Sequence, residues 1–151
     1  FQYHLHADRS GTLTGYDAGG SFGTPMVFNR IVSETKDSSL SSCFNTSNGL
    51  FTAPVTGRYQ LNVIAYISDA PNDLSYFTIR IITSNRDYYA IFDPGQAGLT
   101  GANSYNTLNI HVLADMDAND TAYVNCYTPN GSSTTKVDGS HTTSFSGFLV
   151  C

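Results

Sequence analysis

Two histidines near the start of the chain, His4 and His6, have the spacing that could place both imidazoles around one metal ion. They alternate with Tyr3, Leu5 and Ala7, a pattern that predicts a strand with both histidines on one face. Only Asp8 adds a carboxylate nearby, so the ligand set is incomplete. We therefore expect these histidines to face solvent or an interface.

The acidic run from Asp115 to Asp120 superficially resembles a calcium-binding loop. Asp120 occupies the position where such a loop needs glycine, and Cys126 stands where a bidentate glutamate should be. We expect a solvated turn between two strands. Asp69, Asn72 and Asp73 form a second acidic segment that could be a ligand or ion site, although turn formation explains it well enough.

Asp93 and Gln96 lie in a glycine-rich stretch and are candidate calcium ligands. An Asp-Pro-Gly sequence also favours an ordinary turn, which is the simpler interpretation. Tyr88, Tyr89 and Phe92 follow one another on a single segment. They could form a platform for sugar stacking, although packing in the core or between subunits is the better explanation.

The sequence contains three cysteines, Cys43, Cys126 and Cys151, so at least one thiol has no partner within the chain. Cys126 alternates with Ala122 and Val124 and should point into the core. Whether any disulfide forms stays open. No Cys-x-x-Cys pair, Gly-x-Ser-x-Gly elbow or phosphate-binding glycine loop is present, and the four histidines are scattered. We expect no catalytic residues and no required cofactor.

The length, composition and charge of the chain indicate which classes of partner to expect. The 151 residues suggest a single domain over residues 1–151, and an N-terminal Phe1 suggests the C-terminal part of a longer chain. The net charge is −5, with 7 basic and 12 acidic residues and no basic cluster, so nucleic acid is not an expected partner. No apolar run approaches the length of a transmembrane helix, so membrane insertion is not expected.

Alternation of apolar and polar residues recurs along the chain, with turn-forming residues about every ten positions and no helical period. The clearest strand has Tyr59, Leu61, Val63 and Ala65 on one face. We expect nine or ten short strands, hence an all-β sandwich or barrel. Further expected strands are 26–32, 50–55, 77–81, 88–92, 108–112, 122–126 and 145–151.

One block is more specific than the composition. Phe44, Phe51, Gly57 and Tyr59 are spaced as in the globular head domain of complement C1q, and the sequence Asn48–Tyr59 resembles the signature of that family. The closing segment with Phe145, Gly147 and Phe148 resembles the family's last strand. The two segments together cover these seven signature residues, which we expect to form the structural core.

This resemblance implies a ten-stranded jelly-roll sandwich of two antiparallel sheets that assembles as a homotrimer, with both termini at one end. It also implies calcium near the apex of the trimer, with Asp93 and Gln96 as candidate ligands. The C1q-like and tumour-necrosis-factor-like domains share this jelly roll. Few charges and many Thr, Ser, Asn and Gly residues look more like the phage and bacterial members.

The leading hypothesis is a non-catalytic, extracellular or virion-surface module, the receptor- or glycan-binding tip of a trimeric fibre or spike. Its partners would be itself and a host-surface glycan or protein receptor. One alternative is a trimerisation or capsid-decoration module without a ligand. Another is a secreted invertebrate innate-immune lectin, which glycans on three sequons, at Asn45, Asn119 and Asn130, would favour.

Overall fold

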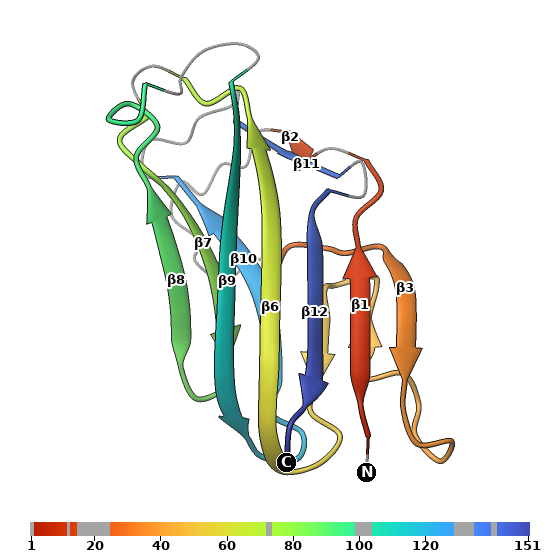
Figure 1. Cartoon of the computed structure of the whole chain (residues 1–151). Helices are drawn as coiled ribbons and strands as arrows, with labels where there is room; N and C mark the ends of the chain where they lie inside the picture. Colours follow the sequence, from red (N-terminus) through yellow and green to blue (C-terminus); the bar gives the residue numbers. More distant parts are fainter. Residues whose placement is uncertain are drawn as a thin grey trace.

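The protein folds as a sandwich of two antiparallel sheets, seen in a computed structural model that describes residues 2–11, 13–14, 25–71, 74–98, 104–128, 135–139 and 142–151 (Figure 1). Twelve strands are formed within these ranges, several of them only two or three residues long. They are β1 (His4–Asp8), β2 (Leu13–Thr14), β3 (Arg30–Thr35), β4 (Phe44–Asn45), β5 (Leu50–Thr52), β6 (Gly57–Ser68), β7 (Phe77–Thr83), β8 (Asp87–Phe92), β9 (Tyr105–Met116), β10 (Thr121–Tyr127), β11 (Lys136–Asp138) and β12 (Ser144–Leu149).

The larger sheet, called sheet A here, is organised around β6. This strand pairs with β9 along its whole length, from Gly57 opposite Met116 to Ser68 opposite Tyr105. On its other side β6 pairs with β12 and β11, and the sheet continues through β1 to β3. The smaller sheet B has the order β4-β5-β10-β7-β8. The all-β jelly-roll class predicted from the sequence is therefore correct.

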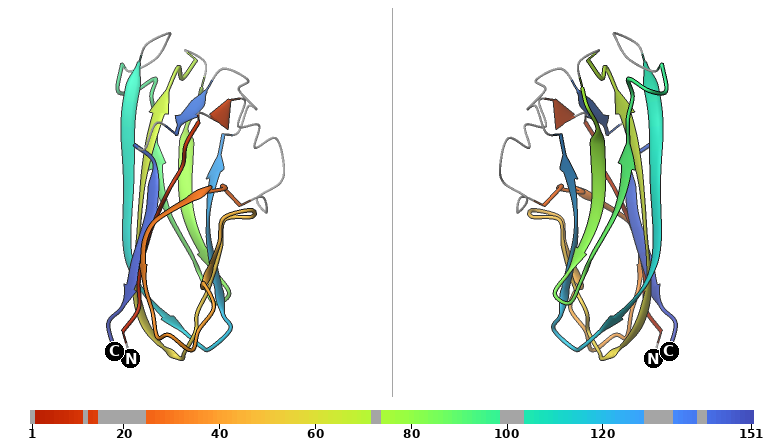
Figure 2. Two further views of the ribbon diagram at one scale, coloured as in Figure 1. Left: turned by 90° about the vertical axis from the view of Figure 1, so that its right-hand side faces the viewer. Right: turned by 90° about the vertical axis from the view of Figure 1, so that its left-hand side faces the viewer.

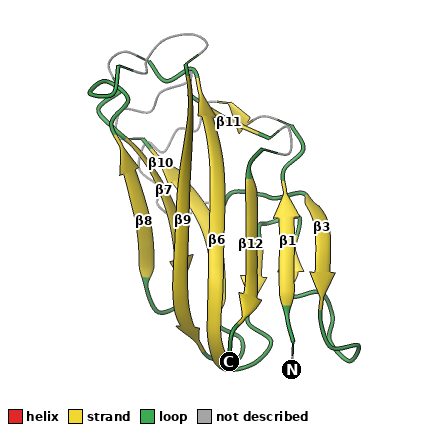
Figure 3. Cartoon of the chain, viewed as in Figure 1, coloured by secondary structure: helices red, strands yellow, loops and turns green. Residues whose placement is uncertain are grey.

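The core lies between the two sheets, as the alternating pattern requires. Successive side chains of a strand point to opposite faces, so each sheet buries every second residue. Tyr59, Leu61, Val63 and Ala65 of β6 are buried and face the buried Ile79 and Ile81 of β7. Figure 2 shows the two layers from the side, and Figure 3 shows that strands and loops make up the described chain, without helices. No described segment is a helix that could cross a membrane.

Both termini lie at the same end of the sandwich (Figures 1 and 2), as the family resemblance implied. We call this end the base and the opposite end the apex. The C-terminus is held at the base by two hydrogen bonds, because Arg58 N donates to Cys151 O and Val150 N donates to Arg58 O.

One strand prediction differs from the structure. The strand expected over residues 26–32 begins only at Arg30 and runs to Thr35. Met26 and Phe28 are instead buried without strand pairing, and the amide of Met26 donates to the carbonyl of Val124. A buried apolar run carries the same sequence pattern whether or not it pairs as a strand, which explains the error.

Some sequence predictions fall outside the described residues. These are Asn72 and Asp73, the sequon at Asn130, and the fourth histidine, His141.

Candidate assembly surface

The outward face of sheet A is the most distinctive surface of the described chain. Residues directly opposite each other on neighbouring strands share a face, so the strand registers define it. Its centre contains uncharged side chains, listed here strand by strand: Tyr105, Thr107, Asn109, His111 and Leu113 of β9; Gln60, Asn62, Ile64 and Tyr66 of β6; Ser144, Ser146 and Phe148 of β12; and His4 and His6 of β1.

Phe148 lies on β12, toward the base of this face, opposite Gln60 on one side and His4 on the other. Its side chain is 46% exposed, and Leu113 in the same row is 48% exposed. Nearer the apex, the rings of Tyr66 and Tyr105 stack with centroids 5.5 Å apart. A contiguous face with several exposed large apolar side chains is typical of a surface that another protein covers.

Charged side chains of this face lie at its border. At the base, Arg58 Nε donates to Asp115 Oδ1 at 2.8 Å. At the side formed by β1 and β3, Arg30 donates to both carboxylate oxygens of the buried Asp8. Positions 60–68, 105–113 and 144–149 contain no charged residue at all. Depletion of charge at the centre with ion pairs at the rim is the usual anatomy of a protein interface.

A second exposed apolar surface lies where the edges of the two sheets meet. The edge strand β8 of sheet B runs beside β9 of sheet A, and a groove of about 510 Å³ separates them. Tyr88, Ala90, His111 and Val112 are among its lining residues. On the outer side of β8, Tyr89 is 63% exposed and Ile91 is 60% exposed. Large apolar side chains are therefore exposed both on the outward face of sheet A and at the edge strand β8.

The aromatic residues of β8 do not form the three-ring platform considered from the sequence. Tyr88 lies opposite Ile81 and Phe92 opposite Phe77, so both point toward the core side, whereas Tyr89 lies opposite Arg80 on the outside. Consecutive residues of a strand point to opposite faces, so Tyr88 and Tyr89 cannot share one.

The signature residues divide between core and surface. Phe44, Phe51, Tyr59 and Phe145 are buried, and their rings contact one another or Phe28, with centroids 5.6 to 6.4 Å apart. Phe148 is not a core residue, which corrects the expectation from the sequence. Because Phe145 points inward, the alternation of β12 places Gly147 inward and Phe148 outward.

Gly57 and Gly147 serve close packing. Neither has a positive φ, so backbone strain is not the reason for glycine there. A Cβ on Gly147 would lie 2.9 Å from Gln60 O, and one on Gly57 would lie 2.7 Å from Cys151 O. Gly57 thereby makes room for the C-terminal residue at the base.

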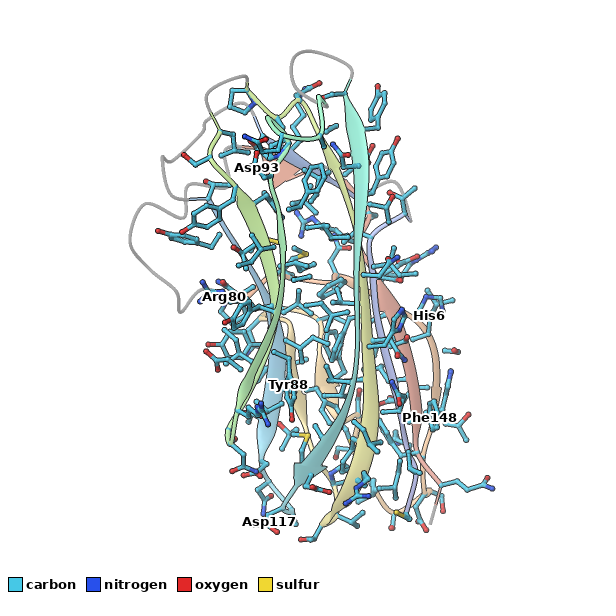
Figure 4. The ribbon with its side chains drawn as sticks, turned by 60° about the vertical axis from the view of Figure 1, so that its left-hand side comes forward. His6, Arg80, Tyr88, Asp93, Asp117 and Phe148 are labelled. Carbon is cyan, nitrogen blue, oxygen red and sulfur yellow. The ribbon has the colours of Figure 1, made fainter. Side chains whose placement is uncertain are left out.

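The candidate metal ligands do not gather into one site. Asp93 lies at the apex, whereas Asp117 of the acidic run from Asp115 to Asp120 lies at the base (Figure 4). Asp93 Oδ1 accepts a hydrogen bond from Gln96 N at 3.0 Å, which is the turn geometry expected of Asp-Pro-Gly. Within the described ranges, no group of three or more His, Cys, Asp or Glu residues could hold a metal ion.

The acidic run at the base is a turn, as predicted. Asp120 Oδ2 accepts hydrogen bonds from Asp117 N at 2.9 Å and from Asn85 Nδ2 at 2.8 Å. Asn119 adopts a positive φ of 74°, which asparagine tolerates better than most residues. These hydrogen bonds use the carboxylate to connect the β9–β10 turn to the β7–β8 turn.

All three cysteines have free thiols, which answers the question left open by the sequence. Cys126 is buried as predicted, and burial raises the pKa of its thiol. Cys43 is half-buried, and burial followed by the nearby Glu34 carboxylate raises the pKa of its thiol. Cys151 is exposed at the base. A buried thiol with a raised pKa is a poor nucleophile, which favours a structural role for Cys126.

Comparison with known proteins agrees with this architecture. The model of one protein family, described as the C1q domain, matches residues 12–150. The globular domain of zebrafish complement 1qA protein is similar with a TM-score of 0.67 and 16% identity, covering 100% of this chain and 98% of that one. Murine APRIL at pH 8.5 gives a TM-score of 0.65 and 12% identity, covering 99% of this chain and 100% of that one. At such low identities these structures support the fold alone, and no curated protein matches the sequence.

Proposed function

Because the chain belongs to the C1q domain family, we propose that it is a non-catalytic module that trimerises and binds a receptor or glycan outside cells. Domains of this family and its tumour-necrosis-factor-like relatives are typically secreted or extracellular, form homotrimers and bind receptors. The residues of this chain that would serve the same purpose are the two exposed apolar surfaces.

The observation that carries the proposal is that these two surfaces differ. A twofold dimer needs one self-complementary patch, whereas a closed ring needs two different patches that fit each other. The outward face of sheet A, with Phe148 and Leu113, supplies one patch. The β8–β9 edge, with Tyr89 and Ile91, supplies the other. Packing the edge of each protomer on the face of the next buries both around a threefold axis.

The position of the two termini suits a module whose apex faces a target. Both termini lie at the base, so the apical loops are free to contact a target. Three protomers present three copies of every apical site in parallel. Avidity then allows weak individual contacts to give tight attachment, with gains of about 10²- to 10⁴-fold over a single site.

The finer proposal is that the module forms the tip of a virion fibre or spike and recognises a host-surface glycan or protein. The low charge content, with many Thr, Ser, Asn and Gly residues, supports this placement. A fibre tip also suits a chain that leaves the sandwich at the base only.

A glycan array with the trimer as the probe tests the proposal. We expect binding to at least one surface glycan, reduced at least tenfold for a monomeric Phe148→Ser variant, since avidity is lost. Tyr123→Ser, which replaces an aromatic residue on the outer face of sheet B, is the matched control. An intact trimer that binds neither glycans nor host cells would favour a trimerisation or capsid-decoration module. Binding that is equal for trimer and monomer would contradict the role of avidity.

A further inference from the structure

Every histidine of the described part of the chain lies on the outward face of sheet A. His4 and His6 are on β1, and His111 is on β9, with β12 and β6 between them. His6 and His111 stand in one row across four strands, because His6 lies opposite Ser146, Ser146 opposite Asn62, and Asn62 opposite His111. Three imidazoles from distant parts of the sequence therefore belong to the surface that the proposed trimer buries.

The surroundings of His4 and His6 offer little to balance a positive charge. His4 lies between Phe148 and Thr35, and His6 lies between Ser146 and Ser33. Figure 4 shows His6 and Phe148 on the same side of the sheet. The acidic group of this face that is closest along β1 is Asp8, and both of its carboxylate oxygens already accept hydrogen bonds from Arg30. Glu34 of β3 points to the other face, where it accepts from Tyr3.

His111 is held in one orientation by β6. Its Nδ1 lies 3.0 Å from Asn62 Oδ1, which also accepts a hydrogen bond from Gln60 Nε2 at 3.0 Å. Since an amide oxygen is only an acceptor, Nδ1 carries the proton of the neutral ring and Nε2 is bare. A second proton would therefore add to Nε2 and give the ring a positive charge.

The charged groups around His111 are few. Arg86, just before β8, and Asp87, its first residue, line the same groove, one of each sign. From β6 and β9, Arg58 and Asp115 lie toward the base and are hydrogen-bonded to each other. No carboxylate in the described ranges is hydrogen-bonded to any of the three imidazoles.

We infer that protonation of His4, His6 and His111 weakens the trimer, so that mild acid releases the protomers. This inference rests on the proposed trimer. Histidine is neutral above about pH 7 and gains a charge between about pH 7 and pH 5. Burial disfavours the charged form of an imidazole that has no carboxylate partner.

Trimer stability should fall as the pH falls, because the separated protomer takes up protons more readily than the trimer. Burial in the proposed trimer removes water from around the three imidazoles, so their charged form is less favourable there than in the separated protomer. Binding of protons to the separated state favours dissociation as the pH falls. The trimer is accordingly most stable at neutral and alkaline pH.

Sedimentation equilibrium from pH 8 to pH 5, with circular dichroism to monitor folding, tests the inference. We expect the protomer concentration at half-dissociation to rise at least tenfold by pH 5, since a one-unit difference in pKa between two states is a tenfold effect. The dichroism spectrum should stay that of a folded β protein. A change of less than tenfold in the wild-type chain would overturn the inference.

Glutamine variants assign the effect to the three rings. Glutamine keeps polarity without titrating, so H4Q/H6Q/H111Q should remain trimeric at pH 5. The single variant H111Q and the double variant H4Q/H6Q should each retain part of the pH dependence. These two variants test the same assignment if the triple variant folds poorly. Wild-type pH dependence in all of these variants would contradict the assignment. A chain that is monomeric already at pH 8 would instead contradict the proposed function.

Discussion

The hydroxyl of the buried Tyr59 donates a 2.7 Å hydrogen bond to the carbonyl oxygen of Val55, four residues earlier. The same hydroxyl lies 3.4 Å from the amide of Val55, which donates to it. One side chain thus satisfies the backbone of the turn that leads into the central strand β6. The aromatic signature therefore does more than fill the core, because it also fixes how the chain enters sheet A.

Tyr59→Phe should reduce the free energy of unfolding by about 0.5–1.5 kcal/mol, because the ring stays but the hydrogen bond is lost. Tyr59→Ala should cost about 3–5 kcal/mol, since it also leaves a large cavity. Denaturant unfolding at one fixed protomer concentration measures both, as oligomer stability depends on concentration. Equal losses in the two variants would show that the hydroxyl carries the whole effect.

Gly147→Ala should destabilise the protein by about 1–3 kcal/mol, because the added Cβ would lie 2.9 Å from Gln60 O in the middle of sheet A. Gly98→Ala is an informative control. It has open space around it but a positive φ of 67°, so its loss comes from backbone strain alone. A variant Gly147→Ala as stable as wild type would contradict the packing described for β6 and β12.

Thiol reactivity should distinguish the three cysteines. At pH 8 we expect Cys151 to react first with an aromatic disulfide reagent, Cys43 more slowly, and Cys126 only on unfolding. The thiolate is the reactive form, and the raised pKa of Cys43 and Cys126 lowers its fraction at this pH. Raising the pH should accelerate the reaction of Cys43. The fast phase should disappear in Cys151→Ser, and its persistence would contradict the assignment.

Asp93→Asn tests whether the carboxylate of Asp93 is needed for its charge or only as a hydrogen-bond acceptor within the turn. Asparagine retains the oxygen that accepts from Gln96 N, so we expect wild-type stability, with a loss of about 0.5–1.5 kcal/mol for Asp93→Ala. Thermal unfolding with calcium and with a chelator measures both variants. Calcium stabilisation of wild type that Asp93→Asn abolishes would instead support an apical calcium site shared by three protomers.

Much of the fold was predictable because it is encoded locally. The alternation of Tyr59, Leu61 and Val63 determines which side of β6 is buried, and the Asp-Pro-Gly sequence at Asp93 predicts its turn. Phe148 was misassigned although the information was present. Counting two residues at a time from Phe145 would have placed it outside.

The assembly surface was not predictable in the same way. Its central row joins His6, Ser146, Asn62 and His111, which come from four separate parts of the chain. The register between such strands depends on long-range packing, which no local sequence pattern specifies. The groove between β8 and β9 likewise exists only once the two sheets have stacked.

The most direct test of the trimer is the molar mass of the chain in solution at neutral pH, measured by light scattering coupled to size exclusion. We expect three times the chain mass of 16.3 kDa for wild type and for Tyr123→Ser. Phe148→Ser should shift to the mass of one folded chain, because it removes a large exposed ring from the outward face of sheet A. A wild-type chain that is folded and monomeric at micromolar concentration would contradict the central claim.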